Sequence, residues 1–223
     1  MSPYFPPAMF YCMADLSHWN AIISHPTPEA FAAAYAYGIR YVALKATQGT
    51  GFVDPVFRAW RAAAEAAGMN VLAYAFLDAA PAASQADHLL ATIGPLSGLE
   101  LAIDVEANPG GADGSVTIPL AADVAQRLAD KAGFLPFYYG TRFGPDGKGG
   151  GLPHRVLSQC PLWLAEWGNQ PICPTGWSAW RIWQATNGRL GRDVEPVPGL
   201  GIVDRSYIAA TSLDEIARWW SRR

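Results

Sequence analysis

The sequence predicts an α/β fold in which a single domain forms an incomplete, irregular (β/α) TIM-like barrel. Segments rich in Val, Ile, Leu and Tyr alternate with Ala-rich amphipathic segments, which is the pattern of repeated strand–helix units. Eight segments of the first kind are present, as many as a closed barrel needs. The 223 residues are 51% hydrophobic and include nine Trp, nine Tyr and nine Phe, enough to bury one substantial core.

Each expected strand is short and bounded by turn residues, and most are followed by a helical pattern, so parallel pairing should dominate. After the fifth strand the connections become too short or too polar for full helices, and residues 144–151 form a Gly-rich loop. The barrel is therefore expected to be irregular in its second half. The expected strands are residues 10–15, 41–46, 71–76, 101–106, 136–139, 162–165, 181–184 and 201–204.

The expected helices have readable ends. Asp54 and Pro55 are expected to form an N-cap followed by proline at the first helical position, and Gly68 should close the same helix. Ser212 and Glu215 fit a capping box, with Glu215 placed to reach back to the Ser212 amide, and open a last helix. Further helices are expected after Pro28, Pro81 and Ile118.

Composition excludes several classes of function. The formal net charge of −3 lacks the basic excess of a nucleic-acid-binding protein. No apolar run reaches the roughly 18 residues of a membrane helix, so a soluble protein without a membrane partner is expected. The first nine residues show no basic segment followed by an apolar one, and a conventional secretory signal is not expected.

The three cysteines are Cys12, Cys160 and Cys173. They have neither the paired spacing of a zinc site nor the density of a disulfide scaffold, so buried thiols are expected, with a Cys160–Cys173 bridge as the alternative. None of the four histidines has acid or cysteine partners at metal-binding spacing. No metal or other cofactor is predicted.

Acidic residues gather where barrel enzymes carry their chemistry, at the carboxyl ends of strands. The first expected strand ends in Asp15, the fourth in Asp104 and Glu106, and the eighth in Asp204. Side chains at i and i+2 share a face of a strand, with Cα atoms roughly 6.6 Å apart, so Asp104 and Glu106 should enter one cavity.

Buried acids can be satisfied by Arg or Lys alone, but two on one inward face are costly to desolvate unless a function compensates. Glycoside hydrolysis is one such function, because crowding by like charge keeps one carboxyl protonated as the acid, here Glu106. A divalent cation held by Asp15, Asp104, Glu106 and Asp204 is the other. The acids alone do not choose between these two.

Aromatic residues near the strand ends favour a sugar substrate, because sugar rings stack on flat side chains whereas phosphates call for basic groups or amide cradles. About half of them are expected to serve only in packing. No GxxxxGK[ST] phosphate loop is present. The aromatic residues in question are Tyr74, Phe76, Tyr139, Trp163, Trp167 and Trp183.

These features resemble the glycoside hydrolase family 25 lysozymes, the Chalaropsis-type muramidases of bacteria, fungi and phage endolysins. The resemblance spans nearly the whole chain, and it depends on the order and spacing of its segments. They are Asp15-Leu16-Ser17-His18-Trp19-Asn20, Leu44-Lys45-Ala46-Thr47-Gln48-Gly49, Phe52-Val53-Asp54-Pro55, Ala73-Tyr74-Ala75-Phe76, Asp104-Val105-Glu106, Tyr139, Trp163-Leu164-Ala165, Trp183-Gln184 and Val203-Asp204.

The resemblance implies cleavage of the β-1,4 bond between N-acetylmuramic acid and N-acetylglucosamine in peptidoglycan. Glu106 would be the general acid. Asp104 would either stabilise the substrate N-acetyl group or act as a base on water, and strand spacing does not decide between these. Asp15 and Asp204 would be supporting carboxylates of the catalytic centre. The groove would be lined by Lys45, Tyr74, Phe76, Tyr139, Trp163 and Gln184.

One position departs from the family pattern. Ala75 stands where many members carry a bulkier residue, often histidine, so a groove contact is expected to be missing. Residues 1–223 are expected to form one catalytic domain, without a separate wall-binding module, that acts as a monomer on the cell wall. A holin or a secretion machine would export it. The alternatives are a catalytically silent barrel that binds wall sugars, and a metal-dependent hydrolase using the same acids.

Overall fold

The computed structural model of the protein describes residues 9–20, 26–108, 114–148, 151–168, 170–210 and 212–220, and for residues 9–12 the backbone alone. Nine strands lie in this part of the chain, all in one sheet. They are β1 (Met9–Leu16), β2 (Tyr41–Gln48), β3 (Phe52–Val53), β4 (Asn70–Phe76), β5 (Leu99–Asp104), β6 (Phe137–Gly140), β7 (Leu162–Ala165), β8 (Ile182–Thr186) and β9 (Asp204–Ala209).

The sheet closes into a barrel. Its strand order is β1-β9-β8-β7-β6-β5-β4-β2, and β2 pairs back onto β1, while β3 forms only a short antiparallel extension of β2. The six neighbouring pairs from β1–β2 round to β7–β8 are parallel, as the sequence predicts. Strand β9 is antiparallel to both of its neighbours, so the barrel is mixed.

The eighth strand differs from the prediction. Residues 201–204 were expected to form it, with Asp204 at its carboxyl end, but β9 begins at Asp204 and runs to Ala209. Because β9 is antiparallel, its first residue lies at the barrel end where the parallel strands finish. Asp204 therefore lies at the expected end of the barrel, although it begins its strand instead of ending it.

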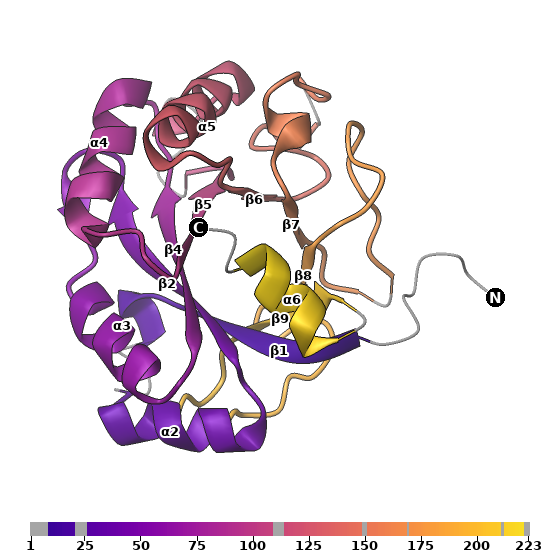
Figure 1. Ribbon diagram of the computed structural model, residues 1–223. Helices are drawn as coiled ribbons and strands as arrows, with labels where there is room; N and C mark the ends of the chain where they lie inside the picture. Colours follow the sequence, from indigo (N-terminus) through magenta and orange to yellow (C-terminus); the bar gives the residue numbers. More distant parts are fainter. Residues whose placement is uncertain are drawn as a thin grey trace.

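Helices cover one side of the barrel, as Figure 1 shows. In the described residues the connections from β6 to β9 contain only loops and a short 3-10 turn, η2 (Leu157–Gln159), which confirms the expected irregularity. The helices are α2 (Pro28–Tyr37), α3 (Phe57–Ala66), α4 (Ala82–Ile93), α5 (Ile118–Ala132) and α6 (Leu213–Trp220).

Two helix starts test the expected caps. The N-cap position of α3 is Val56, so the prediction of Asp54 there was wrong by two residues. The Asp54 carboxylate instead accepts a hydrogen bond from the Val56 amide and holds the turn before the helix. At α6 the Ser212 hydroxyl accepts from the Glu215 amide, the first half of the expected capping box.

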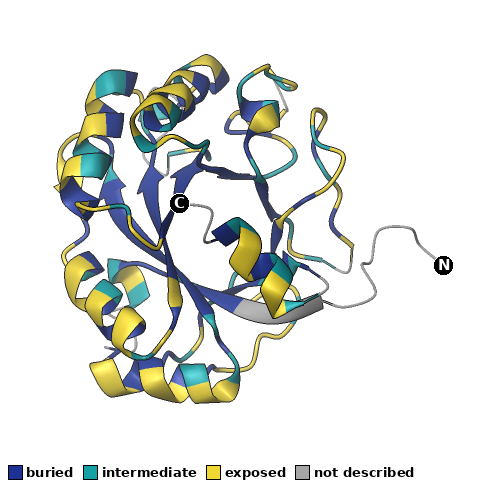
Figure 2. Ribbon diagram, viewed as in Figure 1, coloured by how far each residue is buried: buried dark blue, intermediate teal, exposed yellow. Residues whose placement is uncertain are grey.

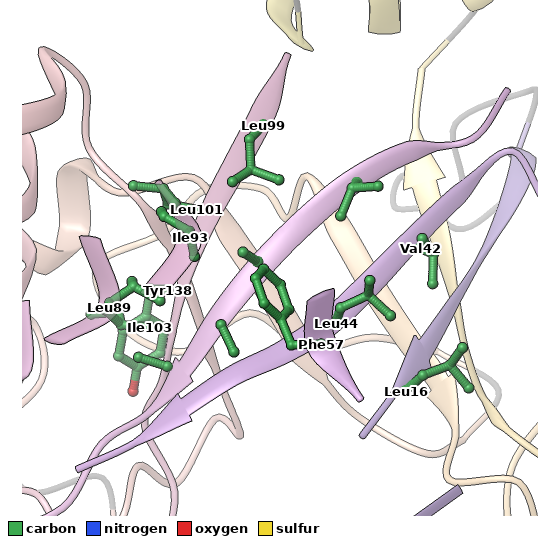
Figure 3. Packing of buried hydrophobic residues seen from close by; sticks show 14 of the residues in the cluster. Leu16, Val42, Leu44, Phe57, Leu89, Ile93, Leu99, Leu101, Ile103 and Tyr138 are labelled. Carbon is green, nitrogen blue, oxygen red and sulfur yellow. The ribbon is translucent and has the colours of Figure 1, made fainter. Parts of the chain in front are cut away.

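Side-chain alternation divides the buried residues into two layers. Outward-facing residues such as Val42, Leu44, Leu101 and Ile103 pack under the helices (Figure 3). Inward-facing residues such as Met13, Leu72 and Trp163 fill the barrel. Figure 2 shows the result, with buried strands inside and helices that expose only their outer faces.

Helix α6 closes one end of the barrel. Its Ile216 and Trp220 belong to the inner cluster, and the Trp220 ring packs on Tyr41 at the first residue of β2, 4.7 Å between centroids. Trp219 packs similarly on Phe137, the first residue of β6. The apolar end is therefore the one where the parallel strands begin, and the opposite end is left for the acidic residues.

Two further predictions concern the described residues. Cys160 and Cys173 are both free thiols, so the alternative of a bridge between them was wrong; Cys160 is buried as expected, whereas Cys173 is only partly buried. The side chain of Cys12 lies outside the described residues. Among the helices described, none combines the length and the apolar character needed to span a bilayer.

Candidate active site

The open end of the barrel holds a cavity of about 500 Å³. Both aromatic and charged side chains line it, and all four predicted acids are among them. The lining residues are Asp15, Ser17, Trp19, Asn20, Lys45, Gln48, Tyr74, Phe76, Asp104, Glu106, Asn108, Tyr139 and Asp204. The four acids, Lys45, Tyr74, Phe76 and Tyr139 are thus brought together as the sequence predicts.

Asp15 and Asp204 are direct neighbours across the β1–β9 ladder. Side chains in such register lie about 4.5–5.5 Å apart at Cβ, close enough for strong repulsion between carboxylates. Burial first, and then the charge of Asp204, raises the pKa of Asp15 well above its usual range. The Tyr74 hydroxyl opposes this shift by hydrogen bonding to Asp15. For Asp204, burial and the charge of Glu106 raise the pKa to about 6.

Asp104 and Glu106 enter the cavity from the end of β5. The strand ends at Asp104, so Glu106 lies in the following loop and not within the strand as predicted. The alternation nevertheless continues, because Asp104, Glu106 and Asn108 all line the cavity while Val105 is buried in the outer layer. The Val105 amide donates a hydrogen bond to the Tyr139 carbonyl at 2.9 Å, which keeps the chain in strand-like register past the strand end.

The pKa values of this second pair are raised as well. Burial, followed by repulsion from Glu106 and Asp15, raises the pKa of Asp104 well above its usual range. Burial also raises the pKa of Glu106, and the nearby Lys45 ammonium partly opposes that. Four carboxyls in one cavity therefore retain protons at pH values where isolated carboxyls are ionised. Such a cluster can donate a proton near neutral pH.

Lys45 is the cation of the site. It is 6% exposed, and its Nζ donates to Gln48 Oε1 at 2.7 Å and lies 4.7 Å from the centre of the Phe76 ring. Burial lowers the pKa of Lys45, and the neighbouring acids, Asp104 first, oppose that effect. A buried ammonium among several carboxyls offsets part of their mutual repulsion.

Gln184 lies beneath the cavity and is not one of its lining residues. Its Oε1 accepts from the Tyr139 hydroxyl at 3.0 Å and from Trp167 Nε1 at 2.9 Å. Its Nε2 lies within hydrogen-bonding distance of both acids of the first pair, at 3.4 Å from Asp15 and 3.3 Å from Asp204. Gln184 therefore connects an acid pair to two aromatic side chains.

The other predicted aromatic residues divide by location. Trp163, expected in the groove, is 1% exposed in the barrel interior, where its indole donates to Ser206 and its ring packs against Tyr139. Trp183 belongs to the outer layer. Trp167 is 49% exposed two residues beyond the end of β7. Two of the six predicted aromatic residues, Trp163 and Trp183, therefore serve only in packing, fewer than the half that was expected.

Sequence reasoning left five lining residues out of the groove. Ser17, Trp19 and Asn20 follow Asp15 in the loop after β1, and a motif search could have found them because they belong to the segment that carries the resemblance. Asn108 continues the alternation of Asp104 and Glu106. Gln48 also belongs to a segment that carries the resemblance, but strand alternation from Lys45 does not predict its side, since a bulge between Lys45 and Thr47 changes the phase of the strand.

Position 75 does not face the groove. Ala75 lies between two lining residues of β4, so its side chain points to the outer layer, where it is buried under the helices. The expected loss of a groove contact at this position was therefore wrong, because a side chain of any size there would meet the helices.

No group of three or more His, Cys, Asp or Glu side chains among the described residues has the arrangement of a metal site.

Comparison with known proteins identifies the family to which the chain belongs. The family model described as glycosyl hydrolases family 25 matches residues 14–192, from β1 past β8. The match includes three of the four acids and excludes Asp204, which lies beyond its end. The chain belongs to glycosyl hydrolase family 25.

Among family 25 relatives, the chain is 29% identical over 190 residues to Lysozyme M1 of Streptomyces globisporus, covering 79% of this chain and 62% of the relative. It thus spans less than two thirds of that protein's length. A bacterial lysozyme from Streptomyces coelicolor has a TM-score of 0.76 at 25% identity, covering 95% of this chain and 97% of that one. A muramidase from Acremonium alcalophilum has a TM-score of 0.79 at 24% identity, covering 96% and 100%, and shows the same fold.

Proposed function

We propose that this protein is a muramidase, a lysozyme that hydrolyses the β-1,4 bond between N-acetylmuramic acid and N-acetylglucosamine in peptidoglycan. One observation carries the proposal: four carboxyls with raised pKa values converge in an aromatic-lined cavity at the end of a family 25 barrel. The protein then acts on the bacterial cell wall, as a monomer with a single active site.

Glu106 is the general acid in this proposal. Burial keeps its carboxyl protonated to higher pH than usual, so it can donate that proton to the glycosidic oxygen as the bond breaks. Its place in the loop directly after β5 lets it approach the leaving group from the cavity wall.

Asp104 assists the attack on the anomeric carbon. It does so by orienting the substrate N-acetyl group, which retains the anomeric configuration, or by activating a water molecule, which inverts it. The anomeric configuration of the newly formed product, followed by NMR before mutarotation, distinguishes these two routes. Asp15 and Asp204 are supporting carboxylates that bind sugar hydroxyls, and the charge of Asp15 also helps to raise the pKa of Asp104.

Digestion of purified peptidoglycan tests the proposal, with mass analysis of the released fragments. Wild type should release fragments with N-acetylmuramic acid at the reducing end. Glu106→Gln should slow the release by about 10²- to 10⁴-fold, the usual contribution of a positioned acid. The matched control is Glu65→Gln on α3, where the side chain is half exposed and pairs only with Arg61. It should be as active as wild type.

Two further results of this experiment would distinguish the muramidase from the alternative functions. Activity abolished by a chelator would replace the muramidase by a metal-dependent hydrolase that uses the same acids. Absence of any release, together with cosedimentation of the protein with peptidoglycan, would favour a silent barrel that binds wall sugars.

A further inference from the structure

Exposed aromatic side chains lie near the carboxyl ends of strands at two places. Trp19, in the loop after β1, is 63% exposed and lines the cavity. Phe52, in the short strand β3 that extends β2, is 36% exposed. The ring of His18 packs between them, 4.7 Å from Trp19 and 5.1 Å from Phe52. We name these three residues the first platform.

Asp54 fixes the position of the first platform. The Asp54 carboxylate, which is 2% exposed, accepts hydrogen bonds from the His18 backbone amide at 3.0 Å and lies 2.8 Å from His18 Nδ1. This one carboxylate ties the loop after β1 to the turn before α3. An exposed aromatic surface that is fixed in this way costs little entropy when a ligand stacks on it.

The second platform is Trp167, beyond the end of β7. Its ring is half exposed, and its indole nitrogen is bound to Gln184, the residue that also contacts Asp15 and Asp204. Gln184 thereby links the orientation of the Trp167 ring to Asp15 and Asp204. An exposed indole anchored by its only donor presents its faces to solvent and so to a ligand.

Strand order sets the two platforms on opposite sides of the barrel. In the ring β1-β9-β8-β7-β6-β5-β4-β2, strand β7 is four places from β2, which the strand of Phe52 extends, and three places from β1, which Trp19 follows. Strand β5, with Asp104 and Glu106 at its end, is likewise four places from β9, with Asp204. The line joining the platforms therefore crosses the line joining the two groups of acids.

We propose that the glycan strand crosses the mouth of the barrel from the Trp19 platform to Trp167, passing between Asp104 and Glu106 on one side and Asp15 and Asp204 on the other. This inference depends on the proposed muramidase function and names the subsites of that same site. Each platform stacks on the apolar face of a sugar ring, one on each side of the bond to be cleaved.

A defined oligosaccharide tests this path. We would use the octasaccharide made of four N-acetylglucosamine–N-acetylmuramic acid units, which contains three cleavable bonds, with its reducing end labelled by borohydride reduction. Removing one platform weakens binding at that end only, so productive complexes shift towards the other end. Trp19→Ala and Trp167→Ala should therefore shift the pattern of labelled products in opposite directions, and each should raise KM by roughly three- to tenfold.

Three control variants sharpen the test. Tyr37→Ala removes a similarly exposed aromatic ring from α2 and should change neither KM nor the product pattern. Trp19→Phe keeps an aromatic face and should restore the wild-type pattern. Trp167→Phe keeps the face but loses the hydrogen bond to Gln184, so a wild-type pattern supports stacking. A pattern like that of Trp167→Ala would assign Trp167 a role through Gln184 and overturn the second platform.

The failure of this proposal can be told apart from the failure of the proposed function. Cleavage by wild type, with equal or same-direction shifts in the two alanine variants, overturns the path and leaves the muramidase intact. If wild type does not cleave the octasaccharide, the proposed function fails, and binding of the same octasaccharide is measured by calorimetry. Weaker binding by both alanine variants would then support the path, and unchanged or absent binding would overturn it.

Discussion

The two ends of the barrel interior are built from the same strands and have opposite character. At the end closed by α6, inward side chains are apolar and pack on Trp219 and Trp220. At the open end they are Asp15, Lys45 and Asp104, each two residues beyond the inward-facing Met13, Ala43 and Ala102. The first end lowers the free energy of the folded state, whereas the second raises it through desolvated like charges. Stability and chemistry are therefore separated along the barrel axis.

The largest expected effect on stability lies at the closed end. Trp220→Ala removes a 4% exposed indole from between α6 and Tyr41, and it should lower the free energy of unfolding by about 3 kcal/mol. Urea denaturation measures the loss. Leu213→Ala, at an exposed position of the same helix, should change stability by less than about 0.5 kcal/mol. Equal losses in the two variants would contradict the view that α6 stabilises the barrel by closing it.

At the open end, removing a charged side chain should raise the free energy of unfolding instead of lowering it. The pKa of Asp204 is raised to about 6, so the folded protein binds more protons than the unfolded chain between about pH 4 and pH 6. The stability that depends on this group is complete below about pH 4 and is lost as the pH rises to about 6. Asp204→Asn should therefore stabilise the protein by about 1 to 2 kcal/mol at pH 7, and by much less at pH 4.

Denaturation of wild type and of Asp204→Asn at pH 7 and at pH 4 tests whether the substitution stabilises the protein. Asn keeps an oxygen that can accept the hydrogen bond from Gln184, so the substitution changes chiefly the charge. Destabilisation at pH 7, or a gain of equal size at pH 4, would show that Asp204 is not an electrostatic cost to the fold.

The smallest expected effect is a change in the pH dependence of activity when Lys45 is replaced, and it tests the role of Glu106. The Lys45 ammonium lowers the pKa of Glu106, against the effect of burial. In Lys45→Met the pKa of Glu106 should rise, so that the acid stays protonated to higher pH and the basic limb of the activity profile moves upward. Rates of peptidoglycan digestion across a pH series measure this limb. A shift to lower pH would remove Glu106 from the role of general acid.

Much of the site could be predicted from sequence because strand ends are local features. Continuous apolar runs at residues 10–14 and 101–103 precede Asp15 and Asp104, and they identify each strand and its acidic end without knowledge of any neighbour. The same reasoning failed at Asp204. The sequence places an acid beside a short apolar segment, but whether that acid begins or ends the strand depends on the direction in which the strand pairs.

Other features were decided by contacts between distant segments. Gln184 was expected in the groove, and its position beneath two acids, Tyr139 and Trp167 follows from pairing among four strands. The bulge in β2 that turns Gln48 towards Lys45 is a mismatch with the register of β4 and leaves no mark in the sequence of β2 itself. Ala75 was assigned to the groove although the phase of its own strand points it outward.

The sequence by itself determined where the parallel strands lie, that acids stand at the ends of the first and fourth of them, and hence that one end of a barrel would carry charge. Those properties depend on side-chain periodicity over a few residues. Only the tertiary structure decided that α6 closes the opposite end and that Asp15 and Asp204 become direct neighbours. Closure of the barrel fixes these relations, because it joins residues as far apart as 15 and 204 through hydrogen bonds that no local pattern encodes.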